Sequence, residues 1–401
     1  MSGTGERRAI VIGAGIVGVC TALELQRRNW AVTIVDRLAP GEGCSFGNAG
    51  ILAAQAVTPV AMPGILKKVP SMLLDPESPL TVRLGSLPTT LPWLLHFWRA
   101  AQRDRLEATA DAMKALNGTS VELHEANARE AGVSDLLKPG RYLYVHRDAR
   151  QINVEKDLAW TLRRDRGSEI ELLEGPALHE SEPELSREYT RGVRVGPMGF
   201  TLNPFRLTQA YAQLFESKGG TVRRAEVLSL KLVKPLGLRL QLIAERGYHM
   251  TFPKAGISLN HVISEMECQF AVTPMEMGLR VAGTEELGNA DDAPAWRRAE
   301  VLKRQARRMF PNANLDNGSR WMGPRPGTPD SLPAIGPLPN HPNIFIAAGH
   351  GHLGLTGGPN TGRIVAALAS NERLNIPLEP YAPDRFSTFT RKTSATTSAP
   401  R

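Results

Sequence analysis

Three glycines near the N-terminus have the spacing that phosphate binding requires. Gly13, Gly15 and Gly18 follow the apolar run 9–12 and open a helical pattern. The first glycine would allow a tight turn, the second would let a pyrophosphate approach the backbone, and the third would let the helix pack closely on the strand. Unpaired N–H groups at the start of that helix would favour negative charge. The motif therefore predicts a dinucleotide site.

An acidic residue completes this unit. Asp36 ends a second apolar run, 32–35, where a carboxylate can accept hydrogen bonds from both hydroxyls of an adenosine ribose. A phosphate on that ribose would be repelled, so NADP is disfavoured even though Arg37 follows. The unit predicts an adenine dinucleotide without that phosphate.

Two more glycine-rich segments could contribute to the same site. The segment 41–50 offers small residues, a hydroxyl and an amide, which can cradle phosphate and place backbone donors near a flat ring. The alternative is an ordinary surface loop. The segment 343–358 reads as a strand, a glycine turn and the start of the helix 359–370, so a second helix N-terminus is expected there.

The composition excludes several classes of protein. The chain has 401 residues, enough for two domains, and only three cysteines, too few for a disulfide framework or a metal cluster. Its net charge of +8 comes from dispersed basic residues, so a nucleic-acid partner is not expected. With neither an apolar span nor a signal-peptide pattern, we expect a cytoplasmic protein. The aromatic patch 93–98 leaves peripheral contact with the inner face of the cell membrane as an alternative to burial.

Elements of secondary structure alternate in a way that indicates two interleaved domains. Helices and strands alternate at both ends, and the stretch 247–281 reads mostly as strands. Residues 58–92 are rich in proline and form an excursion from the sheet, 106–131 is predicted helical, and 204–217 follows a helix-entry signal. The expected class is α/β.

These motifs together resemble the FAD-dependent D-amino-acid oxidase superfamily, and most closely its bacterial D-amino-acid dehydrogenases. The resemblance also rests on segments 45–50, 323–336, 349–354 and 381–386. It implies a three-layer, Rossmann-like FAD domain interrupted by an α+β substrate domain with a mostly antiparallel sheet. The implied ranges are 1–58, 150–236 and 326–375 for the FAD domain, 59–149 and 237–325 for the substrate domain, and 376–401 for a tail with a disordered end.

The resemblance also assigns roles to individual residues. Arg325 matches the arginine that pairs with the substrate carboxylate, with a structural salt bridge as the alternative. Tyr248 and His249 match residues near the flavin, with an ordinary half-buried strand as the alternative. The implied cofactor-binding residues are Gly13, Ala14, Gly15, Ile16, Val17, Gly18, Asp36, Arg37, Cys44, Ser45, Asn48, Ala49, Gly50, Val227, Gly349, His350, Gly351, His352, Leu353, Gly354, Leu355 and Thr356.

The implied reaction is the transfer of a hydride from the substrate Cα to flavin N5. The resulting imino acid is hydrolysed to an oxo acid and ammonia, and the electrons pass to a quinone or another carrier. The substrate is a D-amino acid or a cyclic D-imino acid, and no metal is expected despite the close spacing of His350 and His352. The alternatives are a glycine- or sarcosine-oxidase-like amine oxidase and a catalytically impaired member that acts as a binding or structural protein.

One segment departs from the family pattern. Relatives pass through a β-hairpin and an apolar strand after the region matching 221–230, whereas here 231–238 already matches the segment beyond that strand. We therefore expect one strand and one hairpin of the Rossmann-like sheet to be missing after Leu230. Its loss would leave neighbouring ladder groups unpaired, at about 1–3 kcal/mol for each buried group. Either another segment fills the gap or FAD binding is weakened.

Overall fold

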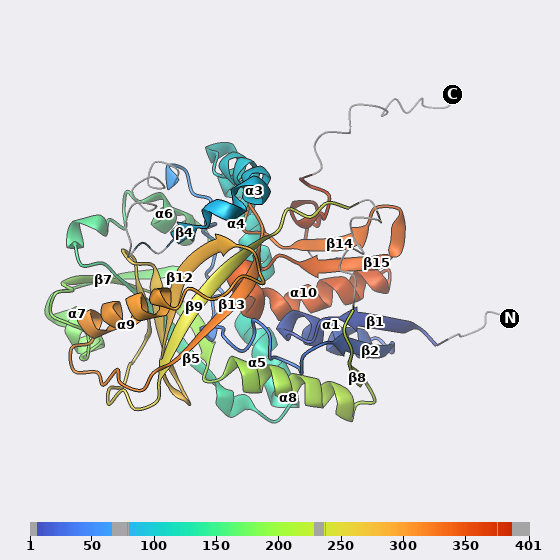
Figure 1. Cartoon of the computed structure of the whole chain (residues 1–401), viewed down its shortest axis with the longest axis horizontal. Coiled ribbons are helices and arrows are strands. Elements are labelled where there is room, and N and C mark those ends of the chain that lie inside the picture. Colours follow the sequence, from blue (N-terminus) through green and yellow to red (C-terminus); the bar gives the residue numbers. More distant parts are fainter. Residues whose placement is uncertain are drawn as a thin grey trace.

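The computed structural model describes residues 6–65, 78, 80–227, 236, 238–374 and 376–386. Two bodies of secondary structure lie side by side (Figure 1). A large sheet with α9 (Arg297–Met309) on its face forms one body, and a small parallel sheet with several long helices forms the other. The predicted α/β class is confirmed.

The smaller body contains the predicted nucleotide-binding unit. β1 (Arg8–Ile12), β2 (Ala31–Asp36) and β8 (Thr221–Arg224) are parallel and lie in the order β1-β2-β8. α1 (Ile16–Gln26) connects the first two strands and buries its apolar residues in the core beneath them. This β–α–β arrangement is Rossmann-like, as predicted.

Glycines let α10 (Gly354–Ala369) lie directly on α1. A Cβ on Gly362 would lie 2.7 Å from the backbone of Cys20, and a Cβ on Gly358 would lie 3.6 Å from the side chain of Ile16. Larger residues would push the two helices apart, and the glycine turns at their N-termini would separate with them.

Two further helices complete the cover of this sheet. α8 (Pro204–Ser217) and α5 (Ser120–Glu130) join the same core. α8 begins where the sequence predicts a helix, because Asn203 Oδ1 accepts hydrogen bonds from the first free backbone N–H groups.

The larger body is a mostly antiparallel ten-stranded sheet, in the order β13-β9-β12-β11-β10-β5-β7-β3, with β4 beside β12 and β6 beside β7. The β5–β10 and β4–β12 pairs are parallel and the others are antiparallel. Its strands are β3 (Ile51–Leu52), β4 (Leu80–Val82), β5 (Leu137–Val145), β6 (Glu169–Glu174), β7 (Arg191–Thr201), β9 (Ile243–Phe252), β10 (Val262–Glu265), β11 (Phe270–Met275), β12 (Gly278–Gly288) and β13 (Ser319–Gly327). The remaining α-helices of the described chain are α3 (Leu87–Ala100), α4 (Arg103–Asn117), α6 (Leu158–Asp165) and α7 (Pro176–Ser181).

The parallel sheet has an open edge. In the described ranges β1 pairs with β2 alone, and β15 (His341–Ala348) pairs only with β14 (Ala334–Leu338). Ile10 is 73% exposed and Ile12 is 51% exposed, unlike the buried apolar residues that a central strand carries. Ile344 on β15 is exposed too, and it lines the same cavity as β1. An open edge at this place is what the loss of a strand after Leu230 predicts, although that residue lies outside the described ranges.

Several element boundaries differ from the sequence expectations. The strand predicted over 221–230 ends at Arg224, and the helix predicted over 106–131 is two helices, α4 and α5. The last long helix begins at Gly354, ahead of the predicted 359, because the glycine turn itself is helical. Part of the proline-rich stretch and the end of the tail, from residue 387, lie outside the described residues.

Candidate functional site

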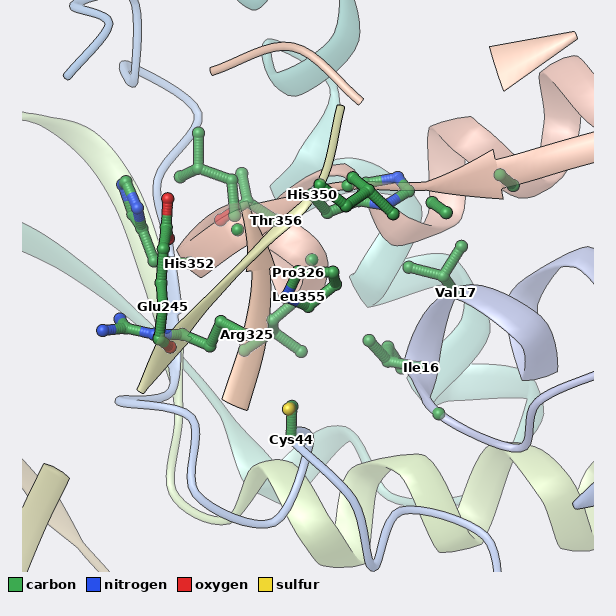
Figure 2. Close-up of a pocket in the computed structure, with 18 of the residues that line it drawn as sticks. Ile16, Val17, Cys44, Glu245, Arg325, Pro326, His350, His352, Leu355 and Thr356 are labelled. Carbon is green, nitrogen blue, oxygen red and sulfur yellow. The ribbon is translucent and has the colours of Figure 1, made fainter. Parts of the chain in front are cut away.

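A cavity of about 3190 Å³ opens between the two bodies of the molecule. Typical small-molecule pockets occupy roughly 300–1,000 Å³, so this space is large enough for a dinucleotide together with a substrate. Residues from the first glycine loop, the segment after Asp36, strands β9, β12 and β13, and the turn before α10 line it. Figure 2 shows Arg325, Glu245 and His352 together at one side of this space and Ile16 and Val17 across from them.

The first glycine loop has the tight geometry that the sequence predicts. Gly13 has a φ of +110°, and a Cβ on Gly18 would lie 1.9 Å from the carbonyl oxygen of Gly13. A side chain at the third glycine would therefore break the turn. Ser45 Oγ accepts a hydrogen bond from the N–H of Ile16 at 3.0 Å, which ties this loop to the next glycine-rich segment.

Asp36 is held at the end of β2 by the backbone. Its two carboxylate oxygens accept hydrogen bonds from Ala14 N–H at 2.7 Å and Leu38 N–H at 2.9 Å. The side chain also lines the cavity. The orientation suits acceptance of further hydrogen bonds from ribose hydroxyls, which stays a prediction.

A buried arginine supports the second glycine-rich segment from behind. Arg280 on β12 is 3% exposed and donates to the carbonyl oxygens of Asn48 at 2.7 Å and Phe46 at 3.2 Å. No salt bridge to Arg280 is present among the described residues, and burial lowers its pKa to about 10. The buried guanidinium makes the electrostatic potential at this loop more positive. Because the loop lines the cavity, this favours an anionic or electron-rich ligand there.

The turn before α10 faces the same space. Gly349 has a φ of +87° and Gly351 a φ of +52°, conformations that favour glycine. His350 shares a hydrogen bond of 2.9 Å with Thr361, and burial lowers its pKa to about 4, so its ring is neutral at pH 7. Thr356 joins this turn to the segment after the second loop, since its hydroxyl donates to the carbonyl oxygen of Ile51.

Most of the predicted cofactor-binding residues line this one cavity, including all those from Gly349 to Thr356. The residues that do not line it are Ala14, Arg37, Gly50 and Val227. Gly50 has a structural place, because its φ is +75° and a Cβ there would lie 2.6 Å from the Thr201 carbonyl oxygen. Val227 is the last described residue before a gap. The cofactor roles of these residues stay predictions, and the structure brings most of the residues to one cavity.

The three predicted catalytic residues have different surroundings. Arg325 lines the cavity, as expected. Tyr248 also lines the cavity, while its ring packs in the core with α9 and its hydroxyl accepts a hydrogen bond from Ala295 N–H. His249 stacks on Trp321 and donates from Nδ1 to the carbonyl oxygen of Gly47 at 3.1 Å. Burial and then the charge of Arg280 lower the pKa of His249 to about 3, so this ring is neutral and anchors the second loop.

Two glutamates that the sequence analysis missed lie beside Arg325. An Nη of Arg325 is 2.9 Å from Glu285 Oε1, and the guanidinium crosses β9 above Gly247, where a Cβ would lie 2.4 Å from it. Glu245 lies directly opposite Arg325 in the register of β9 and β13. Burial and then the charge of Glu285 raise the pKa of Glu245.

A β-bulge puts Glu285 on the cavity side. β12 and β9 pair in regular alternation until the register shifts between Gly283 and Glu285, around Thr284 with a φ of +49°. The extra residue reverses the alternation, so Glu285 lies opposite Gly247 on the same face as Glu245. The sequence signal was a pair of adjacent glutamates in an apolar strand, but the bulge that selects one of them has no clear sequence mark.

His352 joins the same group, because ligand atoms of Glu245, Glu285 and His352 lie within 4.8 Å of one another. The His352 ring faces the cavity, and its desolvation by the surrounding protein lowers its pKa. Such a group could hold a metal ion, but the Arg325 guanidinium already occupies the Glu285 carboxylate. We therefore assign no metal to it.

Comparisons with known proteins agree with this geometry. A sequence model of the DAO family, described as FAD dependent oxidoreductase, matches residues 8–239 and 231–368. A D-amino-acid oxidase of Bradyrhizobium diazoefficiens is 36% identical over 421 aligned residues, covering 95% of this chain and 99% of that protein. The alignment is longer than the 401 residues of this chain, so the chain carries gaps relative to that protein.

Solved structures show the same fold. The L-proline dehydrogenase from P. horikoshii has a TM-score of 0.73 at 20% identity and covers 95% of this chain and 98% of its own. The glycine oxidase from Geobacillus kaustophilus has a TM-score of 0.70 at 20% identity and covers 95% of this chain and 99% of its own. No helix in the described ranges has the length and apolar character needed to cross a membrane.

Proposed function

The chain belongs to the DAO family of FAD-dependent oxidoreductases, and on this premise we propose that it oxidises the CH–NH bond of a D-amino acid or a cyclic D-imino acid. The observation that carries the proposal is Arg325, a guanidinium that lines the cavity close to the turn before α10. Similarity to a protein named D-amino-acid oxidase supports the choice of substrate. An open-chain product imine would be hydrolysed to a 2-oxo acid and ammonia.

The residues of the cavity fit FAD. The glycine loop from Gly13 to Gly18 leaves room for a pyrophosphate against the backbone, and Asp36 would accept hydrogen bonds from a ribose. The Ser45–Asn48 loop and the Gly349–Thr356 turn would hold the flavin end. When bound, FAD supplies the acceptor for the hydride that leaves the substrate Cα.

Arg325 would bind the substrate carboxylate. A guanidinium can donate two parallel hydrogen bonds to a carboxylate and keeps its charge at all working pH values. In the structure one of its Nη atoms already contacts Glu285, so a substrate carboxylate must share or displace that contact. The fixed guanidinium thereby orients the Cα–H bond.

We propose a quinone or another carrier as the electron acceptor, with oxygen as the alternative. The fold neighbours include proteins named dehydrogenase and oxidase, so the fold does not select between them. Hydrogen peroxide release in air at the rate of substrate consumption would favour an oxidase, including one that resembles glycine oxidase. A rate that depends on an added quinone analogue would favour a dehydrogenase.

Peripheral membrane contact is a further proposal that the surface of α3 supports. Trp93 and Phe97 are buried, whereas Leu91, Leu95 and Trp98 are 56%, 53% and 51% exposed and follow one another along one side of the helix. The exposed Arg99 lies next to this ridge and could meet an anionic headgroup.

We expect the protein to sediment with vesicles that contain anionic lipid. The variants Leu95→Gln and Trp98→Gln should reduce that binding at least threefold, because each removes exposed apolar area. Leu172→Gln on β6, another exposed apolar residue, is the matched control and should have no effect. Equal sedimentation of all variants would remove the proposal.

The proposed reaction is tested by the spectrum of the protein. A bound flavin should be visible after purification or after refolding with FAD, and an anaerobic panel of D-amino acids should bleach it. A protein that remains colourless would instead support the catalytically impaired alternative, which the open edge of β1 favours.

A further inference from the structure

Two carboxyl groups lie beside the single guanidinium of Arg325. Glu245 and Glu285 place these carboxyl groups in the cavity, and the guanidinium of Arg325 contacts Glu285 at 2.9 Å. A site that bound only a carboxylate would gain nothing from Glu285, which repels that ligand and competes for the guanidinium, or from a second carboxyl group beside it. The pair therefore needs an explanation beyond recognition of the substrate carboxylate.

The backbone around these carboxylates is fitted to them. A Cβ on Gly327 would lie 2.0 Å from Glu245 Oε1, and a Cβ on Gly351 would lie 3.3 Å from Glu245 Oε2. Glu245 thus reaches over two glycines toward the turn before α10, where Figure 2 shows it beside His352 and Arg325. On the other side, Gly247 leaves the space through which the Arg325 guanidinium reaches Glu285.

We infer that Glu245 and Glu285 recognise the amino group of the substrate while Arg325 recognises its carboxylate, so that the site selects amino acids over carboxylic acids that lack an amine. This inference rests on the proposed function and names two residues that determine its specificity. An ammonium group donates three hydrogen bonds, and the two carboxyl groups offer acceptors within 4.8 Å of each other. The ligand carboxylate takes over the guanidinium contact that Glu285 holds in the free protein.

Two ligands of nearly the same shape test the inference without any oxidation. 2-Aminoisobutyrate has no hydrogen on Cα and cannot transfer a hydride, and pivalate carries a methyl group in place of its ammonium group. Isothermal titration calorimetry with the FAD-loaded protein measures the affinity of each ligand. We expect 2-aminoisobutyrate to bind at least tenfold more tightly than pivalate.

Each variant has its own expected result. Glu245→Gln keeps the shape of the side chain and should lower the preference for 2-aminoisobutyrate at least threefold. Glu285→Gln should lower it as well and should also tighten pivalate binding, because the guanidinium of Arg325 then has no internal carboxylate partner. Glu171→Gln is the matched control, because it breaks an exposed pair between Glu171 of β6 and Arg194 of β7. It should change neither affinity.

Equal affinity of the wild-type protein for the two ligands, or no binding of either, would overturn the inference. A preference that stays unchanged in both Glu245→Gln and Glu285→Gln would overturn it too, and would make the Arg325–Glu285 contact a structural ion pair. The proposed function is judged separately, since bleaching of the flavin by D-amino acids does not depend on these affinities.

Discussion

Arg280 and Arg325 show how one residue type serves two purposes on two strands of the same sheet. Arg280 is buried and donates to carbonyl oxygens of the second glycine-rich loop, so its guanidinium fixes backbone. Arg325 lies at the cavity and contacts Glu285, a partner that a ligand carboxylate can replace. At this scale, function follows from which arginine a ligand can reach.

The substitution Arg325→Lys should lower kcat/KM for a D-amino acid about 30-fold. Lysine keeps the charge but loses the second parallel hydrogen bond to the substrate carboxylate, at a cost of about 2 kcal/mol. Steady-state kinetics with an artificial electron acceptor measures this value. Arg194→Lys, in an exposed pair with Glu171, is the matched control. If both variants retain wild-type kinetics, Arg325 does not bind the substrate.

The elements that form the site were predictable to different degrees. The first glycine loop, Asp36 and the turn before α10 could be predicted because each is a short run whose residue types determine its own geometry. Glu245 and Glu285 could not, because they meet through the register of two strands and a bulge at Thr284. The family resemblance places Tyr248 near the flavin, and the structure packs its ring in the core at a position that also lines the cavity, so this role stays a prediction.

β1 is the element that departs most from what its sequence requires. An apolar strand of a parallel sheet is normally paired on both edges and covered on both faces. In the described chain β1 pairs with β2 alone, and Ile10 and Ile12 are exposed. An uncovered apolar edge is a template for pairing with another chain. The open edge therefore predicts self-association at high protein concentration.

A single charge on this edge should reduce that association. Ile10→Lys should lower the association measured by light scattering, because a lysine on an edge strand opposes strand pairing. The stability of the monomer should change by less than about 0.5 kcal/mol, since the side chain is 73% exposed. Leu91→Lys places the same charge on an exposed apolar position of a helix and is the control. A larger decrease for the helix variant would contradict pairing through β1.

At the scale of the whole molecule, the cavity depends on helices that come from distant parts of the chain. His124 of α5 is fully buried, and its Nε2 donates to the carbonyl oxygen of Leu355 in α10 at 2.8 Å. Tyr211 of α8 stacks on the same ring. Three helices that cover the parallel sheet thus meet at one neutral histidine.

Burial lowers the pKa of His124 to about 4, which predicts how stability depends on pH. Below its ordinary pKa of about 6.5 the unfolded chain binds a proton that the folded protein does not, so the stability contributed by this site decreases as the pH falls from 6.5 toward 4. Urea unfolding at pH 7 and pH 5.5 should show that the wild-type protein loses about 1 kcal/mol more than His124→Gln. An equal loss in both proteins would mean that this histidine is not buried in its neutral form.

The most direct test of the account is an anaerobic absorption spectrum of the FAD-treated protein before and after D-amino acids are added. The account predicts a flavin spectrum that bleaches with at least one D-amino acid and does not bleach with the matching L-enantiomer. A protein that binds no flavin, or a bound flavin that no D-amino acid reduces, would contradict it.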